Sequence, residues 1–343
     1  MDIKEFKNYI FLITEKQVLN YDQAKSCFEF IMSGNASDIL ISSFLTSLKI
    51  NLMINGFTPE IIAAGADIMR EKAIKINAPE DAIDVVGTGG DGHNTFNIST
   101  ATAFVLAGTG VTVAKHGNYA ASSKSGAANV LESLGININN SINNVEESLK
   151  ECGICFLFAP KHHSAMKFVM NVRKELGFRT IFNLLGPLSN PGFVKKQIVG
   201  VYSKELTVPF ANALKKLGST NAWIVCGEDG LDEVSTTGST YCAELKNGEI
   251  REFEITPEII DIPKATLKQL AGGSPDENAY EINELLKGKK GPFNDIVTLN
   301  SAAALMATGN ANSLKDAKEK VLASINEGKA LSKLHALIEK SNS

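Results

Sequence analysis

A glycine-rich loop near residue 90 has the composition of a phosphate-binding turn. The apolar run Ile83 to Val86 is followed directly by Gly87-Thr88-Gly89-Gly90-Asp91-Gly92, and a helical pattern begins at about Ser99. Glycines let the backbone approach a phosphate closely, and the free N–H groups in the first turn of a helix attract negative charge. Asn97 and Thr100 add side-chain donors near that turn. The order of strand, glycine loop and helix therefore predicts an anion site.

Two common nucleotide motifs do not account for this loop. Gly87, Gly89 and Gly92 match the dinucleotide fingerprint, but that motif also needs an acidic residue near position 111, and none occurs between Asp91 and Glu132. A P-loop is excluded because no Gly-Lys-Ser or Gly-Lys-Thr follows at the required spacing. A glycine turn by itself can be purely structural. The long acid-free stretch behind it favours phosphate binding.

A second group of polar residues follows another apolar run. Val111 to Ala114 is predicted as a buried strand, and Lys115-His116-Gly117-Asn118 is expected just past its carboxyl end, where α/β sheets bind ligands. Ser122-Ser123-Lys124-Ser125-Gly126 then leads into a helix predicted from Ala127 to Leu134, another helix start rich in donors. For Ser122 or Lys124 alone, a capping role in a solvated loop is the simpler interpretation.

An acidic pair follows a third apolar run. Ala222 to Val225 is predicted as a strand, and Gly227-Glu228-Asp229-Gly230-Leu231-Asp232-Glu233 comes after its carboxyl end. Magnesium prefers a few carboxylate oxygens together with water and substrate phosphates, so two acids suffice if a diphosphate supplies the rest. A solvated acidic turn is the commoner fate of such a cluster, and the phosphate loop is what favours a metal site. The interpretation requires Asp232 and Glu233 to lie close to residues 87–91.

Arginine is rare in this chain. Only four arginines occur beside thirty lysines, and the planar fork of arginine suits bidentate binding of a carboxylate. Arg173 lies on a helical stretch predicted from Lys161 to Leu176 and is a candidate for that role, with a surface ion pair to Glu175 as the alternative. Arg179 is interpreted as structural, because it begins the segment Arg-Thr-Ile-Phe-Asn.

A possible zinc or redox motif is set aside. Cys152-x-x-Cys155 is followed by His162-His163, but Cys155 begins the apolar run that ends at Phe158, and no second pair of ligands has the usual spacing.

The elements that position these groups fall into two classes. From Lys4 to about Ile76, apolar residues recur at three and four positions, which predicts helices. After Asn77-Ala78-Pro79, short apolar runs alternate with helical patterns, which predicts βαβ units around a mostly parallel sheet. The remaining strands are predicted at Ile154 to Phe158 and Gln197 to Val201, and the final helical pattern runs from Ser313 to Glu339 with one break at Gly328.

Composition narrows the classes of function. The chain of 343 residues is long enough for two domains with a real core, and a net charge of −4 without clustered basic residues argues against a nucleic-acid or membrane-surface protein. The N-terminus lacks the order of a signal peptide, and no apolar stretch reaches membrane-spanning length. Five cysteines suit reduced thiols, so we expect a cytoplasmic protein.

Four segments in this order resemble the signature segments of the anthranilate phosphoribosyltransferase family: Gly87-Thr88-Gly89-Gly90-Asp91, Thr95-Phe96-Asn97-Ile98-Ser99-Thr100, Lys115-His116-Gly117-Asn118 and Arg179-Thr180-Ile181-Phe182-Asn183-Leu184-Leu185-Gly186-Pro187-Leu188. The resemblance covers nearly the whole chain. It implies an α/β fold of the nucleoside phosphorylase and phosphoribosyltransferase kind, with a helical domain at 1–76, joined by a helix at about 163–178, and a large domain with a mostly parallel sheet at 77–343. It further implies a homodimer formed through the helical domain and a role in tryptophan biosynthesis.

The resemblance also implies a set of site residues. Phosphoribosyl diphosphate is expected to meet Gly87, Gly90, Asp91, Thr95, Asn97, Ile98, Ser99, Thr100, Lys115, His116, Gly117, Asn118, Ser122, Ser123 and Ala127. Anthranilate is expected to meet Gly87, His116, Asn118, Arg173 and Pro187, and Mg²⁺ to meet Ser99, Asp232 and Glu233. No side chain is expected to act as an acid or base, because Asn118 and Arg173 would only position the substrate.

The sequence departs from the family pattern at several positions. Tyr119 stands where an arginine is usual, Ala127 where a serine is common and Asn129 where an aspartate is common. Ser164 and Asn171 stand where prolines are frequent. These departures concern affinity and fine positioning more than the class of reaction.

Two other functions remain open at this point. A pyrimidine nucleoside phosphorylase would share the architecture but would use inorganic phosphate and need no metal pair. A non-enzymatic relative that binds nucleic acid is disfavoured by the net charge of −4 and by the intact Asp232-Glu233 pair.

Overall fold

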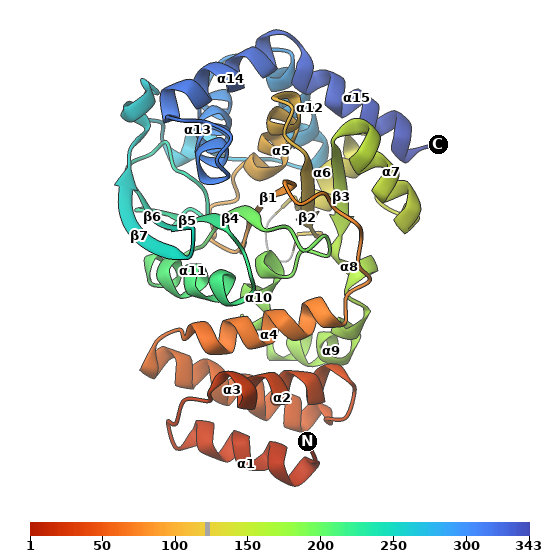
Figure 1. The fold of residues 1–343 in the computed structure, drawn as a ribbon, viewed down its shortest axis with the longest axis vertical. Helices are drawn as coiled ribbons and strands as arrows, with labels where there is room; N and C mark the ends of the chain where they lie inside the picture. Colours follow the sequence, from red (N-terminus) through yellow and green to blue (C-terminus); the bar gives the residue numbers. More distant parts are fainter. Residues whose placement is uncertain (121–123) are drawn as a thin grey trace.

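The computed structural model describes residues 1–120 and 124–343, which form a helical bundle below a larger α/β part (Figure 1). The bundle contains α1 (Ile3–Thr14), α2 (Tyr21–Met32), α3 (Asp38–Asn55) and α4 (Pro59–Glu71), together with α9 (Lys167–Leu176) from the middle of the chain. Helix α9 enters the bundle because Val169 and Val172 are buried in the same apolar cluster as Phe28 and Phe44. The domain boundary after residue 76 stays a prediction.

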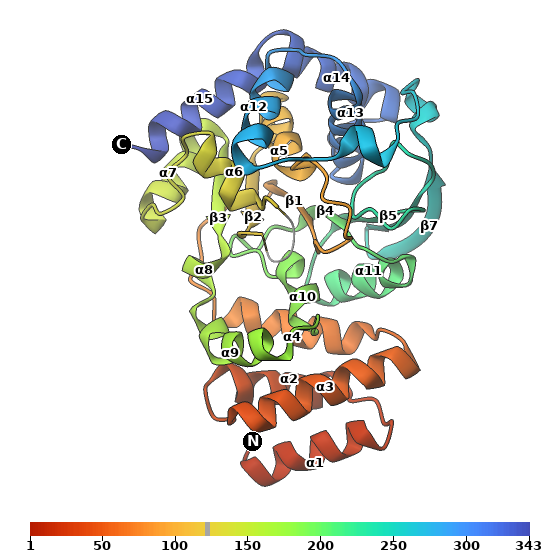
Figure 2. The ribbon, with the colours of Figure 1, turned by 180° about the vertical axis from the view of Figure 1, so that it is seen from behind.

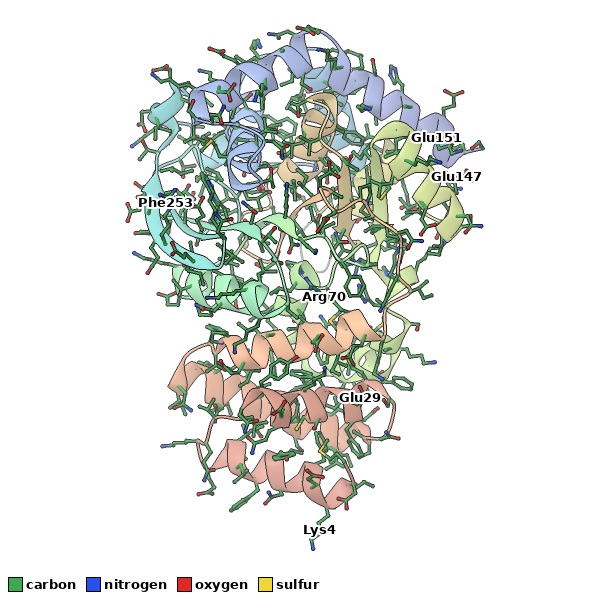
Figure 3. All side chains as sticks on the ribbon, viewed as in Figure 1. Lys4, Glu29, Arg70, Glu147, Glu151 and Phe253 are labelled. Atoms are coloured by element: carbon green, nitrogen blue, oxygen red, sulfur yellow. The ribbon has the colours of Figure 1, made fainter. Side chains whose placement is uncertain are left out.

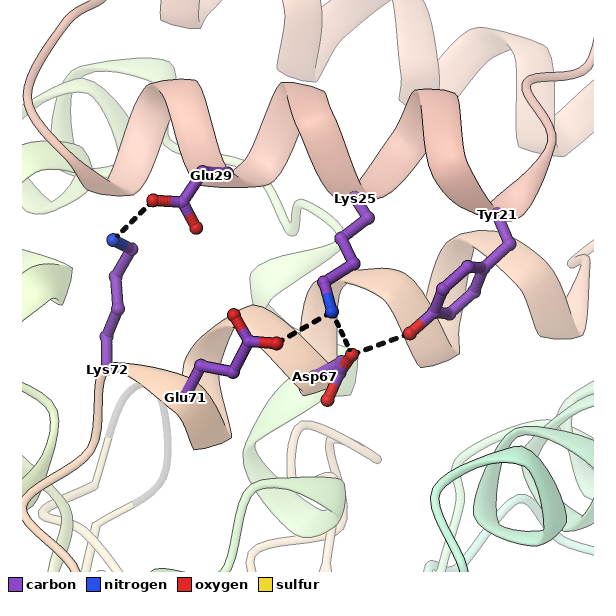
Figure 4. Close-up of polar contacts among 6 residues, drawn as sticks. All are labelled: Tyr21, Lys25, Glu29, Asp67, Glu71 and Lys72. Atoms are coloured by element: carbon purple, nitrogen blue, oxygen red, sulfur yellow. Dashed lines mark hydrogen bonds and ion pairs between the residues drawn. The ribbon is translucent and has the colours of Figure 1, made fainter.

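Polar contacts add to the pairing of α2 with α4 (Figure 4). Asp67 accepts hydrogen bonds from the Tyr21 hydroxyl and from Lys25 Nζ, both at 2.6 Å, and Lys25 Nζ also lies 2.7 Å from Glu71 Oε1. Lys25 and Asp67 are only partly exposed. Partly exposed ion pairs are each worth about 0–1 kcal/mol, so the apolar cluster beneath them contributes most of the stability.

The α/β part is built on one seven-stranded sheet with the order β3-β2-β1-β4-β5-β6-β7. The strands are β1 (Ile83–Gly87), β2 (Val113–Gly117), β3 (Ile154–Phe158), β4 (Lys196–Gly200), β5 (Asn221–Gly227), β6 (Thr240–Lys246) and β7 (Glu249–Ile255). Strands β1 to β5 pair in parallel, whereas β6 pairs antiparallel with β5 and with β7. The predicted fold class, a helical domain with a mostly parallel α/β domain, is confirmed.

Helices cover both faces of the sheet (Figures 1 and 2). The α/β helices are α5 (Ile98–Gly108), α6 (Ala127–Ser133), α7 (Ile142–Cys152), α8 (Ala159–His162), α10 (Phe182–Leu185), α11 (Thr207–Lys216), α12 (Pro275–Leu286), α13 (Pro292–Ala307), α14 (Leu314–Asn326) and α15 (Lys329–Ser341). Helices α5, α13, α14 and α15 form one apolar core with the upper face, and α11 lies on the lower face. The break at Gly328, which has a φ of 70°, is confirmed. No helix of the described residues is both long and apolar enough to cross a membrane.

Strand β1 lies at the point where the strand order reverses. The chain goes from β1 to β2 and β3 on one side, and then returns to place β4 on the other side of β1. Gly87 at the end of β1 pairs with Gly200 at the end of β4. In open α/β sheets, ligands bind outside the carboxyl ends of strands at such a reversal.

Three local predictions were wrong. Strand β2 lies at Val113–Gly117, so Lys115 to Gly117 belong to the strand, where Lys115 and His116 pair with β3 instead of following the strand end. The stretch from Lys161 to Leu176 is divided into the end of α8, a 3-10 turn at Ser164–Met166 and α9.

The third error was the omission of the β6–β7 hairpin. Asn247 and Gly248, with φ of 52° and 80°, form its two-residue connection. Asn-Gly between two alternating runs is a strong hairpin signal, so the sequence did contain the information.

A buried arginine joins the bundle to the α/β part. Arg70, near the end of α4, lies at the border of the two parts in Figure 3. Its Nε donates to the carbonyl oxygen of Leu188 at 2.6 Å, and its Nη1 donates to that of Leu217 at 3.1 Å. Both acceptors belong to the α/β part, so the two parts are connected by polar bonds as well as by a shared apolar core.

Candidate active site

The glycine loop and the acidic pair meet at the carboxyl ends of β1 and β4. The backbone N–H of Gly89 donates to Asp232 Oδ2 at 2.6 Å. A Cβ atom at Gly87 would collide with the Asp232 carboxylate, and one at Gly200 would collide with the Asp232 backbone oxygen. Two glycines at adjacent strand ends therefore make the space that Asp232 occupies. This is the proximity of residues 87–91 to the acidic pair that the sequence interpretation required.

The loop that carries the acidic pair is held by its neighbours. Asn300 of α13 accepts from the Val234 N–H at 2.9 Å and donates to the Val234 carbonyl oxygen at 2.8 Å. Asp229 accepts from the Thr237 hydroxyl at 2.6 Å. The position next to Glu233 is thereby fixed on both sides. Asn300 was missed from the sequence, where it is one of two asparagines in α13 and nothing local distinguishes it.

Three carboxylates crowd this place. Burial, together with the nearby charge of Asp91, raises the pKa of Asp232 to about 7. Burial and the charge of Asp232 also raise the pKa of Glu233, an effect that Lys115 partly opposes. When these carboxylates are ionised, the positive charge near them does not balance their negative charge. A divalent cation would supply the missing positive charge. No group of three histidine, cysteine or acidic side chains in the described part of the chain is arranged to hold a metal.

Lys115 lies next to the glycine loop, and its charge acts on the carboxylate of Glu233. Its Nζ donates to the Val85 carbonyl oxygen at 2.7 Å and to Ser99 Oγ at 3.2 Å. Burial lowers the pKa of Lys115. The backbone of Ser99 donates to Glu233, so Ser99 and Glu233 lie on the same side of the loop.

The start of α5 adds polar groups from several segments. Asn97 donates to the Ser125 carbonyl oxygen at 3.1 Å, and its Oδ1 accepts from Asn278 of α12 at 2.9 Å. The hydroxyl groups of Thr88 and Thr100 are buried, and no hydrogen-bond partner is found for them among the described residues. A substrate with several oxygens would satisfy them.

Three residues of the predicted set are placed mainly by their backbone or by the core. Ile98, the first residue of α5, is buried in the core. Thr95 forms a single β-bridge with Ala271, which fixes the segment before the helix. Asp91 accepts from the backbone N–H of His93 at 3.2 Å and so closes the loop.

His116 connects β2 with the segment Gly186–Leu188. Its ring Nδ1 donates to the Gly186 carbonyl oxygen at 3.2 Å, and its backbone N–H donates to Asp84 Oδ1 at 3.1 Å. Gln197 Nε2 donates to the Pro187 carbonyl oxygen at 3.0 Å. Successive carbonyls of this segment are therefore held by side chains from β2, β4 and, through Arg70, α4. Asp84, Gln197 and Arg70 were not recognised in the sequence as parts of this arrangement.

Arg173 approaches the site from the bundle. Its guanidinium carbon lies 5.9 Å from the centroid of the Phe182 ring, at the start of the helix that leads to Pro187. Glu175 accepts from Asn171 at 3.0 Å, and no ion pair between Glu175 and Arg173 is found in the described part of the chain. No contact among the described residues joins Arg173 to the glycine loop.

The serine-rich segment is described only at its ends. Ser122 and Ser123 lie outside the described residues. Asn129 Oδ1 accepts from the backbone N–H groups of Ala120 and Gly126 at 3.1 and 3.0 Å, which anchors both ends of the segment. Asn118 accepts from the Tyr119 N–H at 2.8 Å through its side chain, while Ala127 begins α6 close to Gly117.

Comparisons with known proteins agree with this arrangement. Residues 79–331 match the glycosyl transferase family, a/b domain, and residues 7–73 match the helical bundle domain of the same family. Anthranilate phosphoribosyltransferases of Parvibaculum lavamentivorans and Brucella suis are each 48% identical to this chain over 338 residues, which is 98% of both proteins.

Solved structures show the same similarity. The crystal structure of anthranilate phosphoribosyltransferase from Thermus thermophilus is 38% identical, with a TM-score of 0.91 over 97% of this chain and 99% of that one. The enzyme from Saccharomyces cerevisiae in complex with PRPP and Mg is 31% identical, with a TM-score of 0.88 over 98% of each chain.

A methyl group at position 200 tests the packing of Asp232. We expect Gly200→Ala to push the Asp232 backbone away from β4 and to weaken binding of phosphoribosyl diphosphate with Mg²⁺ about tenfold or more, which corresponds to roughly 1.4 kcal/mol. Calorimetric titration measures the affinity, and a thermal melt checks folding. The double variant with Asp232→Ala should lose little more affinity than Asp232→Ala alone, whereas additive losses would contradict a shared cause.

Proposed function

The chain belongs to the anthranilate phosphoribosyltransferase family, and we propose that its residues carry out the transfer at the carboxyl ends of β1 and β4, beside the acidic loop. The reaction moves the 5-phosphoribosyl group from phosphoribosyl diphosphate to the amino group of anthranilate and releases diphosphate, in L-tryptophan biosynthesis. The observation that supports this site most directly is the contact of Asp232 with the Gly89 N–H. It supports the proposal because a carboxylate of the acidic pair lies within hydrogen-bond distance of the glycine loop.

The leaving group sets the main chemical demand. As the bond to the anomeric carbon breaks, positive charge develops on the ribose ring and negative charge on the diphosphate. Backbone donors that already point at the departing oxygens stabilise that charge without having to reorganise. In this proposal the loop from Gly87 to Asp91 receives the diphosphate through those of its N–H groups that are not already bonded. The Thr88 N–H donates to the Gly200 carbonyl oxygen at 2.9 Å, and the Gly89 N–H becomes a donor to the ligand only when Asp232 releases it.

Magnesium fits the donor set of this site. We assign Asp232, Glu233 and the hydroxyl of Ser99 as the side chains that would hold it, because the crowded carboxylates have raised pKa values and Ser99 lies beside Glu233. When bound, the ion would neutralise negative charge on the diphosphate. The yeast relative in complex with PRPP and Mg supports the choice of this ion.

Anthranilate needs positioning more than proton transfer. An aromatic amine is uncharged near neutral pH, so no general base is required, and holding it in line with the anomeric carbon lowers the barrier. Burial lowers the pKa of the His116 ring, whose Nδ1 donates to the Gly186 carbonyl oxygen. Asn118 and Arg173 complete the proposed positioning groups, with Gly87 and Pro187 as further contacts. A yeast relative in complex with 4-fluoroanthranilate supports a site for this class of ligand.

The remaining predicted contacts to phosphoribosyl diphosphate are assigned to the same site in this proposal. They are Thr95, Asn97, Ile98, Thr100, Lys115, Gly117, Ala127 and, outside the described residues, Ser122 and Ser123. Approach of the bundle to the α/β part would exclude water that could hydrolyse the sugar phosphate. Five buried, unpaired cysteines are consistent with the proposed cytoplasmic location.

We also propose a homodimer formed through the bundle. Helix α3 buries one apolar face, yet Ile39, Ile50, Met53 and Ile54 on its other face are more than half exposed. These four residues lie on one side of the helix, with Ser43, Thr46 and Ser47 between Ile39 and the other three. Met170 of α9, a helix that packs against α3, is also 62% exposed. A second copy of the chain would cover these exposed apolar side chains.

The reaction is tested by the fluorescence of anthranilate. With phosphoribosyl diphosphate and Mg²⁺, we expect the signal to fall as anthranilate is consumed, and we expect excess EDTA to stop the reaction until Mg²⁺ is restored. No consumption at micromolar enzyme would reject the function. Phosphorolysis of thymidine or uridine instead would indicate a nucleoside phosphorylase.

Arg173 is tested by separating the two substrates. Arg173→Ala should raise the KM for anthranilate roughly 10- to 100-fold, because a hydrogen bond to a charged carboxylate is worth about 1.5–3 kcal/mol, while binding of phosphoribosyl diphosphate is kept. Lys174→Ala, on the exposed side of the same helix, is the matched control and should change neither value. The opposite pattern, with loss of phosphoribosyl diphosphate binding only, would refute the role.

The dimer is tested by a charge on the exposed side of α3. The wild-type protein should have about twice the 36.8 kDa mass of one chain in light scattering. Met53→Glu should shift it to a monomer, because a buried unpaired carboxylate opposes association. Tyr280→Glu changes a side chain of similar exposure in α12 and should leave the mass unchanged. A monomeric wild type would contradict the proposal.

A further inference from the structure

Arg179 lies on the glycine loop. A Cβ atom at Gly90 would collide with Nη2 and Cζ of Arg179, so the guanidinium occupies the space that any side chain at position 90 would need. Gly90 also has a φ of 72°, a backbone conformation that favours glycine. Glycine at position 90 therefore allows the turn and also leaves the space that the guanidinium of Arg179 occupies. The interpretation of Arg179 as purely structural did not foresee this contact.

An aromatic ring holds the guanidinium from another direction. The guanidinium carbon of Arg179 lies 5.0 Å from the centroid of the Tyr202 ring, within the range of a cation–π interaction. Tyr202 follows the end of β4, the strand that pairs with β1. The next residue, Thr180, donates its backbone N–H to Asn183 Oδ1 at 3.0 Å. The arginine is thus placed by its own segment, by β4 and by the loop.

The charge of Arg179 is not matched by a carboxylate. Within residues 1–120 and 124–343, the only ion pair that involves an arginine joins Arg251 to Glu244. Arg179 is half-buried beside the glycine loop. A guanidinium ordered by a ring and a glycine, with no acidic partner among the described residues, is arranged to receive an anionic ligand.

We propose that Arg179 binds the diphosphate group of phosphoribosyl diphosphate as that group settles on residues 87–91. This inference rests on the proposed function, because it takes phosphoribosyl diphosphate as the ligand. The planar fork of arginine matches two phosphate oxygens at once. Its charge offsets repulsion between the diphosphate and the nearby carboxylates of Asp91, Asp232 and Glu233. Because negative charge grows on the diphosphate as the bond breaks, Arg179 also stabilises the leaving group.

Direct titration with two ligands tests the role. The probes are inorganic diphosphate and phosphoribosyl diphosphate, each with Mg²⁺. Arg179→Met should weaken both by about tenfold or more, as expected for a lost charge-assisted bond, and should lower kcat. The KM for anthranilate at saturating phosphoribosyl diphosphate should stay unchanged. Arg179→Lys should retain part of the affinity, because it keeps the charge without the fork.

A matched variant controls for the loss of an arginine. Arg251→Met removes a largely exposed arginine from the edge strand β7 and should bind both probes as the wild type does. If Arg179→Met does not fold, Tyr202→Leu carries the test, since removal of the ring should weaken diphosphate binding while Tyr202→Phe preserves it.

The outcomes separate this inference from the proposed function. A wild type that consumes anthranilate, with Arg179→Met binding both probes normally, overturns the role of Arg179 alone. A rise confined to the KM for anthranilate also overturns it, because that result would place the guanidinium at the carboxylate of anthranilate. A wild type that never consumes anthranilate rejects the proposed function, whatever the titrations show.

Discussion

The arrangement of the site depends on one close approach, that of Asp232 to the carboxyl ends of β1 and β4. Gly87 and Gly200 are paired in register at these ends, and neither has a side chain to keep the acidic loop away. Strands with larger residues at both positions would hold the carboxylate at a distance from the Gly89 N–H. In the proposed function, backbone donors and a cation bind the same diphosphate. That arrangement therefore requires glycine at both Gly87 and Gly200.

The rest of the structure keeps that approach fixed. Asn300 holds the acidic loop from α13, and Lys115 extends beneath the loop toward Ser99. The segment after α10 is also held by side chains. The carbonyl oxygen of Gly186 accepts from His116, that of Pro187 from Gln197, and that of Leu188 from Arg70. Because these donors come from β2, β4 and α4, the two proposed substrate positions share a framework that includes the helical bundle.

The departures from the family pattern have local explanations. Asn129 accepts two backbone N–H groups through its Oδ1, a task that an aspartate could also perform, so the change keeps the anchor of the serine-rich segment. The Tyr119 hydroxyl donates to Glu132 of α6 at 3.1 Å, and the Tyr119 ring packs edge-on against Phe158 at the end of β3. Asn171 donates to Glu175 within α9, where a proline would have no donor.

The sequence by itself determined the class of the fold and the kind of chemistry. Its periodicities predicted the helical opening and the parallel strands, because burial on one face or on both imposes a spacing that is visible in the chain. Its glycine loop and acidic pair predicted a phosphate and metal site, because both follow predicted strands and together, unlike either one alone, they suit a diphosphate with a divalent cation. The hairpin of β6 and β7 was overlooked, although its Asn-Gly turn was present.

Only the tertiary structure decided which distant residues complete the site. Gly200, Asn300, Arg70 and Arg179 have no local pattern that marks them, because their roles come from contacts with segments far away in the sequence. The placement of Lys115 and His116 inside β2 likewise depends on acceptors supplied by β1 and by the segment after α10. A polar side chain is stable in a buried strand only when its partners arrive from elsewhere in the fold, and local sequence carries no record of them.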